Sequence, residues 1–178
     1  MNQMTKNILI SIGLGFGAMV FSGCQDSQKA VRYNDSLVAV QNDIILSFLK
    51  LKDDLGQLDS ADAQAERLAV LRKVENGISK AQKLSFDGDD KQFKKAFMEL
   101  LKFYKKAVAQ DYQELLALAY TTDTVMGHAA KMEALTRRFT KEEEQYDKAF
   151  ARAQKQFATS YNFRVQENEL QEEIDRNR

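Results

Sequence analysis

The sequence predicts an all-α protein, an antiparallel up-down-up-down four-helix bundle that follows a cleaved signal peptide. The 178-residue chain contains no proline and no tryptophan. Beyond its first 23 residues it is rich in alanine, leucine, lysine, glutamine and glutamate, which are strong helix formers. Apolar residues recur there at alternating steps of three and four, which is typical of amphipathic helices. Short turns separate these stretches and favour antiparallel neighbours.

The first residues of the chain have the pattern of an export signal. Met1–Lys6 is short and polar, and Ile8–Val20 is an apolar run of 13 residues without a charge. A membrane-spanning helix needs about 20 such residues, whereas a signal-peptide core is of this length. The small residues Ser22 and Gly23 then precede Cys24, the only cysteine. An ordinary secretory signal followed by an unrelated cysteine is the alternative.

The motif Phe21-Ser22-Gly23-Cys24 resembles a bacterial lipobox, with Phe21 at the position where leucine is usual. The resemblance implies that residues 1–23 are a lipoprotein signal peptide and that Cys24 is acylated. Each buried CH2 contributes roughly 0.8 kcal/mol, so two or three acyl chains attach a protein firmly to a membrane. Gln25 follows the cysteine instead of an aspartate. The resemblance therefore implies the outer membrane, at its periplasmic face or at the cell surface.

Composition limits what the remaining chain can be. Cleavage before Cys24 leaves 155 residues, which fit one domain with a real core. Without Lys6, 25 basic side chains face 26 acidic ones, and this balance argues against nucleic acid as a partner. Acylation of Cys24 leaves no thiol for a disulfide, so stability is expected to come from packing.

The first half of the bundle is expected to contain two helices. Residues 24–28 form the lipidated cysteine and a short linker, whose four extended residues reach at most about 14 Å. A first helix is predicted over residues 29–55, with an apolar face of Val31, Asn34, Val38, Gln41, Ile45 and Phe48. Ser60 is the expected cap of a second helix over residues 61–84. Its internal Gly77 indicates close packing, and its apolar face comprises Leu68, Leu71, Val74, Ile78 and Ala81.

Two further helices complete the prediction. Asp89 and Gln92 are spaced as a capping box for a third helix over residues 90–120. The fourth is expected over residues 124–163, so that the bundle spans residues 29–163 and is roughly 36–60 Å long. Residues 164–178 carry eight charged side chains and are expected to be a polar C-terminal extension, frayed or disordered.

Several short motifs are similar to those of one family. They are Ala30-Val31-Arg32-Tyr33-Asn34-Asp35, Gln41-Asn42, Phe86-Asp87-Gly88-Asp89, Phe103-Tyr104 and Asp111-Tyr112. They resemble motifs in a group of uncharacterised bacterial surface lipoproteins whose mature domain is a helical bundle. The resemblance spans most of the chain after Cys24. It implies no catalytic residue, because the family has no established activity.

Polar residues on the predicted apolar faces are the main candidates for a site. They are Asn34, Gln41, Glu75, Asp111, His128 and Glu142. A buried polar group without a partner costs about 1–3 kcal/mol, so these residues are expected to pair with one another. Such a layer fixes helix register, as single polar residues do in coiled coils. The alternatives are a wet ligand cavity and an error in the phase assigned to the helices.

No metal, cofactor or catalytic motif is expected. His128 is the only histidine, whereas a di-iron bundle needs a Glu-x-x-His pair on each of two helices, and zinc needs several His or Cys ligands. Haem held by His128 and Met98 is the remaining transition-metal alternative. Asp87-Gly88-Asp89-Asp90 resembles a calcium loop, but its twelfth position is Met98 and not glutamate. The chain also lacks a phosphate loop and a nucleophile elbow, and Glu142-Glu143-Glu144 is interpreted as a mostly solvated face.

Six lysines of the third predicted helix form a possible basic interaction face: Lys91, Lys94, Lys95, Lys102, Lys105 and Lys106. They are expected either to pair with neighbouring acidic residues or to bind an anionic surface. The sequence therefore favours a lipid-anchored, non-enzymatic envelope protein that binds or scaffolds an envelope protein or an anionic surface. The alternative is a small-ligand or cofactor carrier that uses polar residues in the bundle core.

Overall fold

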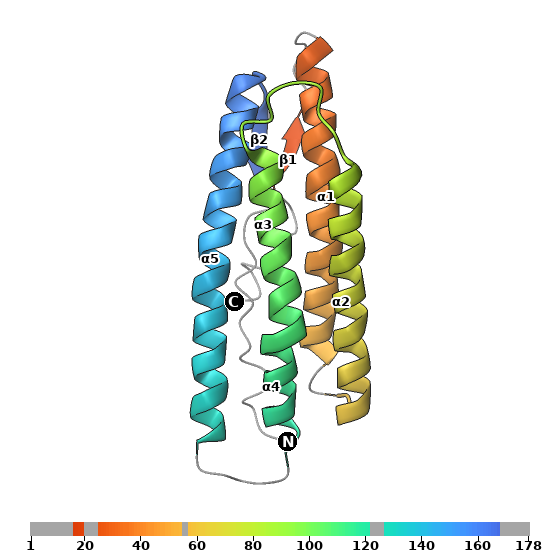
Figure 1. Ribbon diagram of the computed structural model, residues 1–178, viewed down its shortest axis with the longest axis vertical. Helices are drawn as coiled ribbons and strands as arrows, with labels where there is room; N and C mark the ends of the chain where they lie inside the picture. Colours follow the sequence, from red (N-terminus) through yellow and green to blue (C-terminus); the bar gives the residue numbers. More distant parts are fainter. Residues whose placement is uncertain (1–15, 20–24, 55–56, 122–126, 168–178) are drawn as a thin grey trace.

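The computed structural model describes residues 16–19, 25–54, 57–121 and 127–167. The helices form rods that lie side by side in Figure 1, and the colours show that rods consecutive in the chain run in opposite directions. The predicted all-α helical bundle is confirmed. The helices are α1 (Gln25–Asp54), α2 (Ser60–Lys83), α3 (Phe93–Lys106) with the π-helical turn η2 (Ala107–Asp111) and α4 (Tyr112–Ala119) in the same rod, and α5 (His128–Ser160).

Helix α1 begins immediately after residue 24, which itself lies outside the described residues. The expected linker is therefore wrong over residues 25–28, which form the first turn of α1. Asp26 places a carboxylate near the positive end of the helix. Ser27 is buried, and its hydroxyl donates a hydrogen bond of 2.7 Å to the carbonyl oxygen of Tyr161. This contact attaches the start of α1 to the end of α5.

Helix α2 packs through its small residues. Its buried face is Ala63, Arg67, Val70, Val74, Gly77 and Ala81. A Cβ atom on Gly77 would lie 2.7 Å from Cδ1 of Ile44, so the predicted close packing is confirmed. The predicted face was wrong at Leu68, which is 42% exposed, because the close approach of α1 excludes larger side chains from the contact. The cap is Asp59 and not Ser60, since its carboxylate accepts the Asp62 N–H at 2.9 Å.

Helix α3 starts later than predicted because two residues before it are left-handed. Lys91 has φ of 52° and Gln92 has φ of 67°. The expected Asp89–Gln92 capping box is wrong: Asp90 accepts the backbone N–H of Gln92 at 3.1 Å and of Lys94 at 3.4 Å. Asp89 instead accepts the backbone N–H of Lys91 at 2.9 Å.

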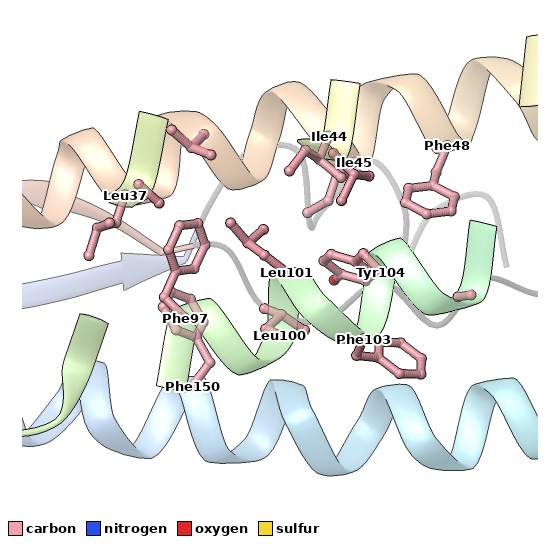
Figure 2. Close-up of a cluster of buried hydrophobic side chains, with 14 of the residues drawn as sticks. Leu37, Ile44, Ile45, Phe48, Phe97, Leu100, Leu101, Phe103, Tyr104 and Phe150 are labelled. Atoms are coloured by element: carbon pink, nitrogen blue, oxygen red, sulfur yellow. The ribbon is translucent and has the colours of Figure 1, made fainter. Parts of the chain in front are cut away.

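The core lies between the helices, and its largest side chains come from α1, α3, α4 and α5, while α2 contributes small ones. Figure 2 shows Leu37, Ile44, Ile45 and Phe48 of α1 opposite Phe97, Leu101 and Tyr104 of α3, with Phe150 contributed by α5. Towards the start of α1 the core becomes aromatic. There Phe157, which is fully buried, packs on Tyr33, Phe86, Phe93, Tyr161 and Phe163, with ring centroids 5.0–5.8 Å apart.

Two short strands lie outside the helical rods. Strand β1 (Phe16–Met19) pairs antiparallel with β2 (Arg164–Glu167), and Met19 is opposite Arg164. The first residues of the predicted polar extension are therefore a strand, while residues 168–178 lie outside the described residues. Strand β1 belongs to the predicted signal peptide, so this pairing is a feature of the uncleaved chain.

Candidate functional site

Buried polar and charged side chains are the candidate site within the bundle. Those on the helices and away from their ends are Asn34, Gln41, Arg67, Asp111, Glu143, Asp147 and Gln154. They include three of the six residues predicted for a polar layer, namely Asn34, Gln41 and Asp111. The structure separates all seven into three groups along the bundle.

The other three predicted members do not belong to the core. Glu75 is exposed, and its carboxylate lies 2.8 Å from the ammonium of Lys105. Glu142 is half-buried and lies 2.9 Å from Lys106. His128 is half-buried as the first residue of α5. For both glutamates a lysine on the neighbouring α3 offers an ion pair at the surface, which avoids the desolvation of a charge.

The first group joins α1 to α5. The amide nitrogen of Gln154 donates a hydrogen bond of 2.8 Å to the side-chain oxygen of Asn34, and both residues are wholly buried. The Asn34 amide donates in turn to Asp35 at 3.1 Å. Asn34 therefore pairs with a residue outside the predicted set, while Asp111 lies in the π turn further along the bundle. The Asn34–Gln154 pair favours one register of α5 against α1.

Breaking this pair on one side is expected to destabilise the bundle. Asn34→Leu removes the acceptor of the buried Gln154 amide and should lower the free energy of unfolding by about 1–2 kcal/mol. Asn34→Leu with Gln154→Leu should cost less than the two single changes added together, since neither partner is then left unpaired. Chemical denaturation measures both, with the exposed Lys95→Ala as control. Strictly additive losses would show that the pair makes no specific contribution.

The second group is the most acidic part of the core. Glu143 is fully buried and Asp147 is 9% exposed, one turn apart on α5. Burial raises the pKa of Tyr104 well above its usual value, and Asp147 and Glu143 raise it further. Burial and the charge of Glu143 do the same to the pKa of Tyr112. Both phenols thus lie beside the carboxylates of α5, with Gln41 on the α1 side of Tyr104.

Sequence reasoning missed Glu143 and Asp147, and its interpretation of Glu142-Glu143-Glu144 as a solvated face was wrong at Glu143. The residue predicted to lie on the apolar face was Glu142, one position away from Glu143. Tyr146, one turn further along α5, is half-buried and stacks on Phe103 at 5.1 Å. The pattern of one helix cannot show that tyrosines of a neighbouring helix lie beside its buried carboxylates.

The third group surrounds the π turn in a rod that was predicted to be a continuous helix. The guanidinium of Arg67 donates to the backbone carbonyl of Val108 at 3.0 Å and to Gln64 at 2.8 Å. Arg67 is 7% exposed, and this burial lowers the pKa of its guanidinium. Asp111, in the same turn, pairs with Arg138 of α5. A π turn disrupts the regular ladder of backbone hydrogen bonds, and Arg67 satisfies one carbonyl there.

The predicted lysine face is divided between different partners. Lys94 caps α2 by donating to the carbonyls of Gln82, at 2.9 Å, and Leu84. Lys91 pairs with Asp89 at 2.6 Å and Lys102 with Glu99 at 2.7 Å. Lys105 pairs with Glu75 of α2, and Lys106 pairs with Glu142 of α5. Of the six, Lys94 and Lys95 make no ion pair with the described residues, and Lys94 is engaged by the two carbonyls instead.

No metal centre can be built from the described residues. Nowhere in them do three His, Cys, Asp or Glu side chains come close enough to hold a metal ion. In the calcium-like segment, the carboxylates of Asp89 and Asp90 accept hydrogen bonds from backbone N–H groups. Met98 and His128, the alternative haem ligands, are both half-buried.

Comparison with known proteins does not extend these observations. No protein-family model, curated protein or solved structure matches this chain. Among the described helices none is both long and apolar enough to cross a membrane. Function is therefore inferred from the residues themselves: the motif that ends at Cys24, the three buried polar groups, and the surface around the start of α1.

Proposed function

We propose that this chain is a lipid-anchored envelope protein whose helical bundle binds or scaffolds another envelope component and catalyses no reaction. The observation that carries the proposal is the uncharged run Ile8–Val20 followed by Ser22-Gly23-Cys24. The start of α1 at Gln25 supports it, because the anchor then leads directly into the bundle. The expected place is the outer membrane, at the periplasmic face or the cell surface.

The interior of the bundle supports a scaffolding role over a catalytic one. Asn34 is paired with Gln154, Asp111 with Arg138, and Arg67 with a backbone carbonyl. These contacts join α1 to α5, α5 to the π turn, and α2 to the π turn. Groups committed to holding helices together are not free to act on a substrate, so the outer surface is the proposed working surface.

Replacing Cys24 tests the anchor. Cys24→Ala is expected to abolish incorporation of a fatty-acid analogue and to leave the longer, uncleaved precursor, because the acylated sulfur is the only attachment proposed. Metabolic labelling and gel mobility in a bacterial host measure both. Ser22→Ala, which keeps a small residue, is the matched control and should be labelled like the original chain. Equal labelling of Cys24→Ala and the original chain would contradict the proposal.

The second candidate function is a small-ligand or cofactor carrier. The observation that favours it is the second buried group, where Glu143 and Asp147 lie among tyrosines in the core. Elemental analysis and an absorption spectrum of protein purified from its own host distinguish the candidates. A stoichiometric metal or a chromophore, with a melting temperature that falls on its removal, would favour the carrier.

A further inference from the structure

One end of the bundle contains the start of α1, the helix that follows Cys24 in the sequence. The start of α1 contacts the end of α5 through Ser27 and Tyr161. The hydroxyl of Tyr161 in turn donates to the carbonyl of Asp89, just before α3, at 3.1 Å. We call this the anchor end; it is the upper end in Figure 1, where β2 also lies.

Two adjoining hollows open on the α5 flank near the anchor end. One, of about 550 Å³, is lined by Lys91, Arg152, Lys155 and hydroxyl-bearing residues at the end of α5. The other, of about 520 Å³, shares Arg152 and Lys155, adds Arg164, and has an apolar floor of Ala151, Ala158, Phe163 and Val165. We call Lys91, Arg152, Lys155 and Arg164 the basic rim.

The basic rim has few partners within the protein. Lys91 pairs with Asp89, and Arg152 uses one nitrogen to donate to the Lys148 carbonyl at 3.2 Å. Neither Arg152, Lys155 nor Arg164 forms an ion pair with any described residue. All four side chains are exposed, and no carboxylate lines either hollow. A concave surface with this excess of positive charge attracts anions.

A third hollow, on the opposite flank, provides a contrast. It lies between α1 and α2 over Gly77, with a volume of about 300 Å³, and also contains lysines. There Asp43 lies 3.4 Å from Lys73 and 3.7 Å from Lys80. Its positive charge is thus partly neutralised, whereas that of the basic rim is not.

We propose that the basic rim docks on the anionic phospholipid headgroups of the membrane that holds the anchor, and so tilts the bundle onto its α5 flank. The proposal rests on the proposed anchor at Cys24. Lys155 and Arg152 lie five and eight residues before the end of α5, within about 12 Å of the anchor end along the helix axis. With no linker after Cys24, this flank stays beside the headgroups. The apolar floor suits the acyl region just below them.

The position of the flank can be measured with probes at matched heights. The processed, acylated protein has no free thiol, so a cysteine added by Gln156→Cys on α5 or by Ser79→Cys on α2 can be labelled alone. Both residues are exposed and lie four residues before the end of their helices. Each labelled protein is reconstituted in vesicles of phosphatidylcholine, alone or with phosphatidylglycerol. Quenching of the probe by a lipid-linked quencher reports its distance from the membrane.

The expected result is stronger quenching at position 156 than at position 79, on phosphatidylglycerol-containing vesicles only. Arg152→Glu with Lys155→Glu should reduce the docked fraction by more than about tenfold, since each basic residue near an anionic surface favours docking roughly fivefold. Arg72→Glu with Lys141→Glu changes the net charge equally at exposed sites outside the rim and should leave docking intact. High salt should abolish the difference between the probes. Circular dichroism confirms that both double variants are folded.

Flotation of the same vesicles separates the two proposals. Protein that floats with the vesicles, but is quenched equally at both positions or equally on both kinds of vesicle, is anchored and not docked, which overturns the docking alone. Equal loss of docking in the two double variants would assign the effect to net charge and would also overturn the role of the rim. Protein that does not float overturns the anchor, and the docking with it.

Discussion

Replacing Phe157 with alanine is expected to lower the free energy of unfolding by about 3–5 kcal/mol. Phe157 is fully buried, and its ring contacts five other aromatic rings. Those rings come from α1, α3, the connection before α3 and the segment after α5. Partners held by so many separate elements cannot move together to fill the cavity, so the cost should lie near the upper end of this range.

Chemical denaturation followed by circular dichroism measures the loss, and Leu68→Ala is the control. Leu68 was predicted to belong to the core, yet it is 42% exposed on α2. Its replacement should cost less than about 1 kcal/mol, because little apolar area leaves the interior. Comparable losses for the two variants would show that the aromatic cluster is not the centre of stability at the anchor end.

Arg67→Met is expected to cost about 2–3 kcal/mol, because it leaves the carbonyl of Val108 buried without its donor. Methionine keeps much of the apolar length of arginine, so loss of packing contributes little. The variant should also destabilise the π turn locally, in addition to lowering the free energy of unfolding of the whole bundle. Hydrogen exchange of the backbone amides in the π turn, Ala107–Asp111, is expected to accelerate before the rest of the bundle is affected.

The matched control is Arg137→Met. Arg137 is also on a helix, but it is 69% exposed and pairs with Glu133 at the surface. Exposed ion pairs contribute little, so this change should cost less than about 1 kcal/mol and should leave exchange in the π turn unchanged. If Arg67→Met proved equally mild, water and not Arg67 would be the partner of the Val108 carbonyl.

The helical bundle was predictable because its signals are local. The absence of proline and the recurrence of apolar residues in steps of three and four favour helices. This pattern can be recognised in the sequence without knowing what each helix packs against. The face of α1 was predicted well, since large residues such as Phe48 mark it clearly. The face of α2 was not, because its contact with α1 uses Gly77 and alanines, while its leucines lie beside the contact.

The polar groups depend on pairs that lie far apart in the sequence, and this limited their prediction. The pattern of α1 alone predicts that Asn34 and Gln41 are buried. Their neighbours, Gln154 and Tyr104, are determined by how the other helices pack against α1. The π turn is a second case: residues 90–120 contain no glycine or proline inside the helix to mark it. Only the position of Arg67 on α2 brings a side-chain donor to the Val108 carbonyl in this turn.

The start of α1 at Gln25 has a mechanical consequence for an acylated Cys24. If Cys24 carries the proposed acyl chains, a helix that begins at Gln25 leaves only the cysteine itself between the lipid and the bundle. Rotation of the bundle is then expected to be coupled to rotation of its lipid, and a force applied to the far end of the bundle is expected to be transmitted to the acyl chains with little extension of the chain. Inserting a few glycines after Cys24 should therefore let the bundle rotate more freely than its lipid, as fluorescence anisotropy would detect.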